Sequence, residues 1–290
     1  MIIDAHAHLW AKQQGIVDGK PVYDLGGGRS NFGGEVRQMM PAYMTDGANS
    51  AERVVANMDY ARVSAGVITQ EYIDGNQDEY LAECKRIFPT RLKICALYQE
   101  KSLGDLSAFD GIKICASRLK DRNLLNHTLP FEYAAKNGKF ISIDLADGNE
   151  QVGQMQEIIG TFPDLKIAIG HFGMVTRENW QEQIKLARNK NVFIESGGIT
   201  WLFNEEFYPY PSGVKAIKEA ADLVGFNKLM WGSDYPRTMT AITYKMSYDF
   251  ITKTNEISEK DKSLFLGLNA KEFYGFEDLY IPEAIKNMVE

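Results

Sequence analysis

The sequence predicts an α/β protein, a closed (β/α)8 barrel (TIM barrel), as a single domain over residues 1–290 with a long lid-like loop after the first strand. Short apolar runs rich in Ile, Val and Phe recur eight times, and segments with helical patterning separate them. Polar residues suited to chemistry follow several of these runs. Strands that alternate with helices pair in parallel through right-handed crossovers, so eight such units favour a closed barrel.

Strands and helices are expected in strict alternation along the chain. The strands are expected at 2–8, 66–71, 93–98, 111–115, 139–145, 166–171, 191–196 and 228–234. The helices are expected at 52–64, 78–88, 130–137, 150–161, 177–189 and 211–224. Asn137-Gly138 and residues 161–164 are break signals just before two of the strands. An open doubly wound sheet is the alternative, but no dinucleotide-binding glycine pattern follows the first strand.

The first strand carries the pattern Asp4-x-His6-x-His8. Alternate side chains of a strand point to one face, so these three residues are expected on the same side. Two imidazoles at this spacing can bind one divalent metal. The alternative is a pair of surface histidines near a terminus that take no part in chemistry. This alternative is less favoured because the chain has only four histidines and another one follows a second strand.

Further polar residues lie at the ends of the later strands. In the fifth strand, Ile141 and Ile143 would pack on helices while Ser142 and Asp144 point inward. The sixth strand ends at His171, the seventh in Glu195-Ser196-Gly197-Gly198 and the eighth in a segment containing Asp234. Buried Asp and His are uncommon unless they are paired or coordinated, and a barrel places its active site at the C-terminal ends of its strands. The sequence therefore predicts an active site at this end.

Two connections are unusually long. Residues 9–50 follow the first strand and contain two glycine-rich stretches, which makes this segment a candidate lid. It is not expected to be a phosphate loop, because no Gly-Lys-Ser/Thr follows the glycines. Residues 198–212 follow the seventh strand and are aromatic. This second loop is expected either to cover a substrate ring, with Trp201 as the contact, or to form a homodimer contact.

The composition limits the function classes. A net charge of −7 and a pI near 5.3 argue against a nucleic-acid surface but allow a small anionic substrate in a locally basic pocket. Three cysteines without metal or redox spacing predict free thiols in a reducing compartment, and hence a cytoplasmic location. No secretory signal is expected. No apolar run approaches the ~18 residues that a membrane helix needs.

Taken in order, four segments of the chain resemble the amidohydrolase superfamily. They are 3–8, 162–173, 231–236 and 267–276, and residues 109–114 also look like the family's fourth strand. The resemblance covers nearly the whole chain. It is closest to the amidohydrolase-2 branch, which holds aminocarboxymuconate-semialdehyde decarboxylase-like enzymes and the sugar and pyrone-dicarboxylate lactonases.

The resemblance implies a hydrolase. The residue at the end of the fifth strand departs from the pattern of the decarboxylase-type members and favours the lactonase branch. Decarboxylase-type members carry a metal-binding histidine at the end of the fifth strand, where this chain has Asp144. Lactonase-type members are more similar there, and some of that branch work without an essential metal. The sequence thus favours the opening of a lactone of a sugar acid or carboxylated ring. The alternatives are a metal-dependent, non-oxidative decarboxylase of an aromatic or muconate-type acid and a barrel that serves only for binding.

Each candidate residue has an expected role. Asp234 is expected to be the general base that activates water, and His171 to be an electrophilic catalytic group. With one bound zinc or manganese, His6 and His8 would be ligands, and Asp234, Asp144 or both would complete the site; alternatively, Asp144 would orient a histidine. Without a metal, the histidines would polarise the substrate carbonyl. Arg118 and Arg237 are suited to binding a substrate carboxylate.

Lys113 introduces one more alternative through the resemblance. In binuclear relatives a carbamylated lysine bridges two metals. The sequence disfavours this alternative, because a second metal would need more histidines than the chain has.

Overall fold

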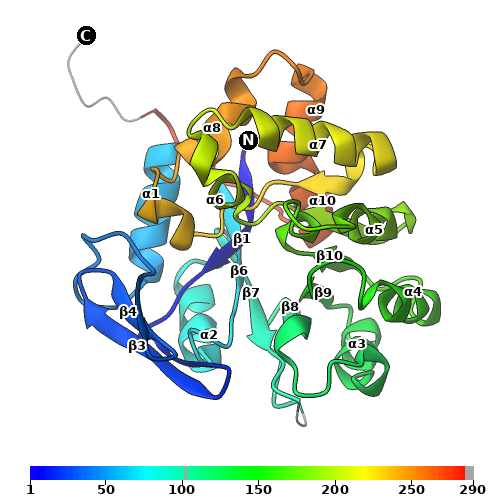
Figure 1. Cartoon of the computed structure of the whole chain (residues 1–290), viewed down its shortest axis with the longest axis horizontal. Helices are drawn as coiled ribbons and strands as arrows, with labels where there is room; N and C mark the ends of the chain where they lie inside the picture. Colours follow the sequence, from blue (N-terminus) through cyan, green and yellow to red (C-terminus); the bar gives the residue numbers. More distant parts are fainter. Residues whose placement is uncertain (101–102, 285–290) are drawn as a thin grey trace.

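An eight-stranded sheet of parallel strands forms the centre of the molecule, in a computed structural model that describes residues 1–100 and 103–284 (Figure 1). Its strands follow one another in chain order: β1 (Ile3–His8), β6 (Ala65–Thr69), β7 (Leu92–Leu97), β8 (Gly111–Cys115), β9 (Phe140–Asp144), β10 (Ile167–Ile169), β11 (Val192–Glu195) and β12 (Leu229–Met230). The predicted (β/α)8 barrel is confirmed. The prediction of one domain over 1–290, which includes residues outside the described part, stays a prediction.

The barrel closes where the last strand meets the first. The Ala5 N–H donates to the Trp231 carbonyl at 2.9 Å, and the His8 N–H donates to the Tyr235 carbonyl at 2.8 Å. The strand β12 is shorter than the expected 228–234, because the chain beyond Trp231 turns to bond with β1 instead of continuing beside β11. This closure carries the segment around Asp234 across the end of β1.

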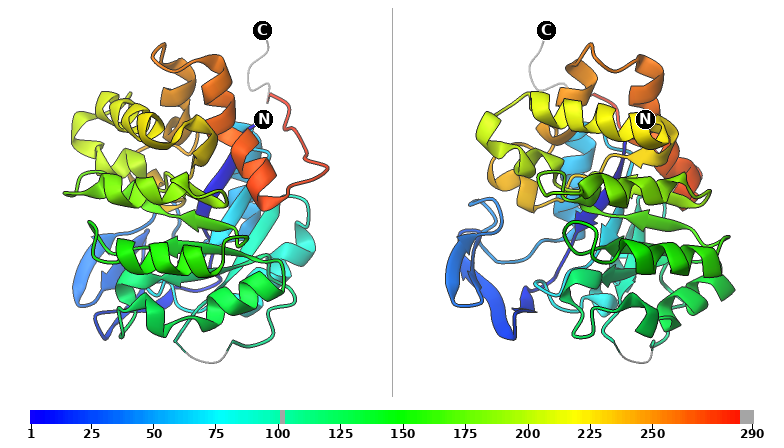
Figure 2. Two further views of the ribbon diagram at one scale, coloured as in Figure 1. Left: turned by 90° about the vertical axis from the view of Figure 1, so that its right-hand side faces the viewer. Right: turned by 45° about the vertical axis from the view of Figure 1, so that its right-hand side comes forward.

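Helices surround the sheet (Figure 2). They are α1 (Ala51–Ala61), α2 (Asp78–Ile87), α3 (Leu129–Lys136), α4 (Val152–Thr161), α5 (Trp180–Lys185), α6 (Ile199–Leu202), α7 (Pro211–Val224), α8 (Met246–Lys253), α9 (Glu259–Ser263) and α10 (Asn269–Tyr274). The helix α5 is shorter than the expected 177–189, since Asn179 is left-handed and a 3-10 turn follows at Leu186–Arg188. No helix in the described ranges is long and apolar enough to cross a membrane.

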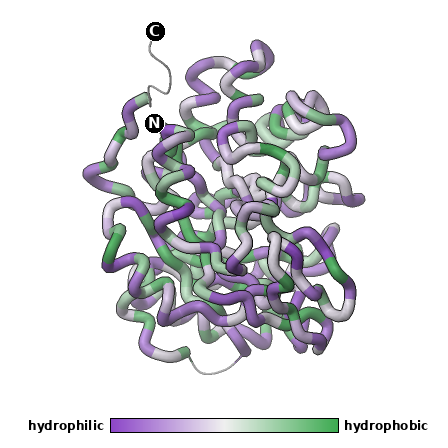
Figure 3. Tube along the Cα trace, turned by 90° about the vertical axis from the view of Figure 1, so that its left-hand side faces the viewer, coloured by the Kyte–Doolittle hydropathy of each residue, from purple (hydrophilic) through white to green (hydrophobic). Residues whose placement is uncertain are grey.

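The core lies between the sheet and the helices. Ile141 and Ile143 of β9 belong to a buried cluster that also contains Phe131 of α3 and Ile158 of α4. This arrangement confirms the outward face expected for the fifth strand. Many of the outer turns are hydrophilic (Figure 3). The polar residues inside the barrel are therefore exceptions to the usual placement of polar residues at the surface.

The connection 9–50 corrects one expectation of the sequence. It is not an irregular loop but a four-stranded antiparallel sheet that protrudes beside the barrel (Figure 2). Its strands are β2 (Gln14–Val17), β3 (Lys20–Gly26), β4 (Arg29–Phe32) and β5 (Glu35–Gln38). One face packs Val17 and Val22 against Ile73, in the loop after β6. The guanidinium of the pocket residue Arg237 lies 5.8 Å from the centre of the Trp10 ring, and Gln13 donates to Asp74 at 3.1 Å. The segment therefore borders the pocket wall, and its role as a lid stays a prediction.

Candidate active site

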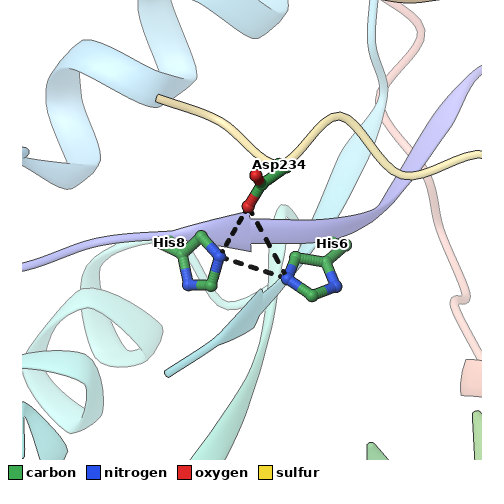
Figure 4. A group of neighbouring side chains, drawn as sticks. All are labelled: His6, His8 and Asp234. Carbon is green, nitrogen blue, oxygen red and sulfur yellow. Dashed lines mark hydrogen bonds and ion pairs between the residues drawn. The ribbon is translucent and has the colours of Figure 1, made fainter. Parts of the chain in front are cut away.

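His6 and His8 lie side by side on β1 with their rings turned into the barrel (Figure 4). Both are buried, and their Nε2 atoms are 3.1 Å apart. The third residue of the pattern, Asp4, has a different task. It accepts hydrogen bonds from the Ser233 N–H at 2.8 Å and from the Tyr244 hydroxyl at 2.8 Å. Asp4 therefore anchors the loop that carries Asp234.

Asp234 lies in that loop, directly beside the two histidines (Figure 4). Its Oδ1 is 2.9 Å from the Nε2 of His8 and 3.9 Å from the Nε2 of His6. Its backbone N–H donates to the His6 carbonyl at 2.9 Å, which fixes the loop to β1. Although burial opposes it, the hydrogen bond with His8 and the charge of Arg237 hold the pKa of Asp234 far below its usual range. Asp234 is thus a buried carboxylate.

These three residues fit one divalent metal. Glu195 Oε1 lies 2.6 Å from the Nδ1 of His6, so in a neutral His6 this nitrogen carries the proton and the Nε2 lone pair faces His8 and Asp234. Burial, and then the charge of Arg237, lowers the pKa of His8, which favours the neutral imidazole that binds metals. Metal–ligand bonds of about 2.0–2.2 Å place tetrahedral ligands about 3.3–3.6 Å apart. The three atoms converge at a comparable spacing, and their chemistry suits zinc.

Glu195 is a further candidate residue whose role the sequence does not reveal. It ends β11, is buried, and bonds both the Nδ1 of His6 and the Gly197 N–H, the latter at 2.6 Å from Oε2. Carboxylates that bond the outer nitrogen of a ligating histidine fix its ring and its tautomer. The position at a strand end is the only sequence signal for this residue, since a partner 189 positions away cannot be recognised from one sequence.

We predict that Glu195→Gln lowers the affinity for zinc by about 10- to 100-fold while the fold is retained. The amide keeps the shape of the side chain but loses the charge, and its single oxygen can accept from His6 or from the Gly197 N–H but not from both. Equilibrium dialysis of the metal-free protein against buffered zinc measures the change. Glu205→Gln, on the exposed loop after α6, is the matched control and should bind zinc like the parent protein. An unchanged affinity in Glu195→Gln contradicts the proposed role of Glu195.

Asp144 and His171 form a second group with Lys113. Asp144 Oδ2 lies 2.6 Å from the Nζ of Lys113 and 3.5 Å from the Nε2 of His171. Burial opposes the ionised forms, but the Lys113 ammonium holds the pKa of Asp144 well below its usual range, and Asp144 raises the pKa of His171 to about 10. His171 is therefore a cation suited to stabilising negative charge. The paired ammonium of Lys113 also disfavours a carbamylated lysine, because carbamylation needs the neutral amine.

Asp144 is not a member of the His6–His8–Asp234 triangle, but the two groups share a histidine. The carboxylate of Asp144 reaches a metal-binding spacing with His171 and with the same His6 that belongs to the triangle. Its nearest charged partner is Lys113, which supplies a positive charge that a metal would otherwise provide. The expectation that Asp144 is a metal ligand stays a prediction.

The remaining candidates line a pocket of about 240 Å³ at the C-terminal ends of the strands, together with His8, Asp144, His171 and Asp234. Arg118 contributes to its wall and pairs with Glu71 at 3.0 Å. Arg237 also lines it and donates to both oxygens of Asp74 at 2.8 Å. The structure thus brings all the predicted site residues except His6 into one pocket wall, with His6 buried behind it.

The aromatic side chains of the loop 198–212 differ in their burial and in their contacts. Trp201 lines the pocket, and its indole N–H donates to Asp234 Oδ2 at 2.9 Å. Tyr210 is buried and packs on Phe250, whereas Phe207 is 76% exposed. A homodimer contact through this loop stays a prediction, with Phe207 as its exposed aromatic residue.

A family model described as Amidohydrolase matches residues 3–276 of the chain. Among curated proteins none matches. Solved structures are similar over almost the whole barrel. One is a probable 2-pyrone-4,6-dicarboxylic acid hydrolase from Acinetobacter baumannii with bound citric acid, at 17% identity and a TM-score of 0.67, with 95% of this chain and 99% of that chain covered.

Two further structures extend the range of similar proteins. An amidohydrolase from Burkholderia multivorans with bound zinc has a TM-score of 0.68 at 14% identity, with 96% of this chain and 100% of that chain covered. A 5-carboxyvanillate decarboxylase from Novosphingobium aromaticivorans, complexed with manganese and 4-hydroxy-3-methoxy-5-nitrobenzoic acid, has a TM-score of 0.54 at 16% identity. The match covers 77% of this chain and 79% of that chain. At these identities the likeness is one of fold.

Proposed function

The chain belongs to the amidohydrolase family, and from that premise we propose that it opens a lactone of a sugar acid or of a carboxylated ring by hydrolysis. The observation that carries the proposal is the buried carboxylate of Asp234 at the pocket wall, 2.9 Å from the Nε2 of His8 and in the same wall as His171. A base, an electrophile and an open pocket at the strand ends are the groups that ester hydrolysis requires.

The reaction follows from the residues present. Asp234 takes a proton from a water molecule as the water oxygen bonds to the lactone carbonyl carbon. The carbonyl oxygen gains negative charge, which the imidazolium of His171 stabilises. The bond between that carbon and the ring oxygen then breaks. Asp234 returns its proton to the departing oxygen, and the product is a hydroxy acid whose new carboxylic acid group releases its proton to the solvent.

His6, His8 and Asp234 would hold the single divalent metal that the geometry accommodates. When bound there, zinc or manganese supplies a Lewis acid that polarises a carbonyl and lowers the pKa of water. The relative from Burkholderia multivorans, which has the same fold and was solved with bound zinc, supports a divalent metal in this protein. Glu195 would orient His6 toward the ion.

An anionic substrate is proposed from the pocket wall. Arg118 and His171 line it, and Arg118 leaves guanidinium donors beyond its bond to Glu71. Arg237 also lines it, but its free Nε and Nη1 atoms are buried beside the bond to Asp74. The A. baumannii relative, named as a probable dicarboxylic acid hydrolase and solved with citric acid, supports a carboxylated substrate. A carboxylate on the lactone would therefore add binding energy in this pocket.

The test is a panel of lactones assayed by acid release at constant pH, with each carboxylated lactone paired with its methyl ester. We expect turnover of at least one carboxylated lactone and a kcat/KM about tenfold lower or more for its ester, which lacks the charge. Products are identified by mass. Addition of water supports the proposal. Release of CO2 from an aromatic or muconate-type acid, with no lactone opened, overturns it in favour of the decarboxylase.

A further inference from the structure

The segment after β11 connects several parts of the site. Glu195 bonds His6, Gly197 accepts a hydrogen bond from the Nδ1 of His171 at 2.9 Å, and Trp201 of α6 bonds Asp234. We propose that Trp201 is a positioning residue for Asp234, whose carboxylate its indole N–H holds in one orientation. The inference rests on the proposed function, in which Asp234 is the base.

The two oxygens of Asp234 have different partners. Oδ1 lies 2.9 Å from the Nε2 of His8, and Oδ2 accepts from the Nε1 of Trp201 at 2.9 Å. A quarter-turn of the carboxylate about the Cβ–Cγ bond would break both contacts together. The Trp201 N–H therefore holds the plane of the carboxylate so that one oxygen faces His8 and the other faces the indole.

The backbone is built to bring Trp201 to this place. Gly198 begins α6 in a left-handed conformation, with φ +72°. A Cβ atom at this position would lie 1.8 Å from the indole nitrogen of Trp201, so any side chain displaces the ring. Gly197 is equally confined, because a Cβ there would lie 2.9 Å from Oε2 of Glu195 and 3.0 Å from His6. The two glycines allow the loop to pass between Glu195 and the indole.

This role differs from the substrate contact that the sequence suggests for Trp201. A side chain that only contacts substrate changes KM when it is removed, whereas a side chain that holds the base changes kcat. Trp201 is 37% exposed, so its ring face is available to substrate while its N–H is committed to Asp234. The two roles can be separated by removing the N–H and keeping a ring.

The kinetic arm compares Trp201→Phe and Trp201→His with Leu202→Ala. Leu202 lies on the same helix and does not line the pocket, among the residues that the structure describes. We expect kcat to fall about tenfold in Trp201→Phe with KM changed less than about twofold, and to recover partly in Trp201→His, which restores an N–H donor. Leu202→Ala should match the parent protein. A change in KM alone overturns the proposal.

A second arm needs no substrate. A double-mutant cycle with Trp201→Phe and Asp234→Ala, measured by urea unfolding in the presence of a chelator, reports the coupling of the two side chains. We expect a coupling of about tenfold in the unfolding equilibrium constant, as for a hydrogen bond to a charged group. Additive effects overturn the proposal. Coupling in a protein that opens no lactone supports the placement of the indole and overturns the proposed function, so the two failures are distinguishable.

Discussion

Asp234→Asn is expected to lower lactone turnover by about 10³-fold, within the range that a positioned general base contributes. The amide has almost the same shape as the carboxylate but cannot take a proton from water. Its oxygen can still accept the hydrogen bond from Trp201 or from His8, so the loop should remain in place. Steady-state kinetics at saturating lactone measures the loss, and circular dichroism with thermal unfolding confirms the fold.

A matched substitution separates the loss of the base from a general effect of lost charge. Asp249 on α8 pairs with Lys253 away from the pocket wall. Asp249→Asn should therefore keep turnover within about twofold of the parent protein, since Asp249 does not line the pocket and an amide oxygen can still accept from the Tyr208 hydroxyl. Turnover near the parent value in Asp234→Asn would contradict both the assignment of the base and the mechanism proposed for the pocket.

The sequence predicts the barrel well because its signal is local. Apolar runs of β-branched residues mark each strand, and β8 (Gly111–Cys115) has the expected bounds. The expectation of a loop at 9–50 is wrong for an identifiable reason. The glycines there punctuate hairpins: Gly19, Gly28 and Gly34 all have positive φ in turns between short antiparallel strands. The segments between these turns are too short and too polar for their alternation of apolar and polar residues to indicate strands.

The sequence predicts the residues of the site only where they lie at the ends of predicted strands. A barrel gathers the ends of its strands, so the order of residues along the chain is enough to expect His6, His8, His171 and Asp234 together. The partners of each side chain depend on register and on loop paths that one sequence does not contain. Glu195 behind His6 and the indole of Trp201 on Asp234 both depend on the turn of Gly197-Gly198.

Lys113→Met is expected to lower the free energy of unfolding by about 3 kcal/mol, because it leaves a buried carboxylate without its main partner. The side chain of Lys113 is fully buried and that of Asp144 is 8% exposed, with 2.6 Å between Nζ and Oδ2. Removal of a desolvated ion's partner costs about 3–5 kcal/mol. The loss expected for Lys113→Met falls at the lower end of this range because His171, at 3.5 Å, still compensates part of the negative charge of Asp144. Urea unfolding at constant pH measures the loss.

The double variant Lys113→Met with Asp144→Leu tests whether the loss comes from the unpaired charge. Replacement of a buried ion pair by apolar residues of similar volume is often neutral, so most of the stability should return. Lys85→Met is the matched control. Lys85 pairs with Asp110 at 2.9 Å, but both side chains are about one-fifth exposed and Lys93 also pairs with Asp110 at 3.2 Å. The remaining charge therefore stays compensated, and the loss should be about 1 kcal/mol. A single variant as stable as the parent protein, or a double variant no better than the single, would show that the Lys113–Asp144 pair does not govern the stability of the barrel interior.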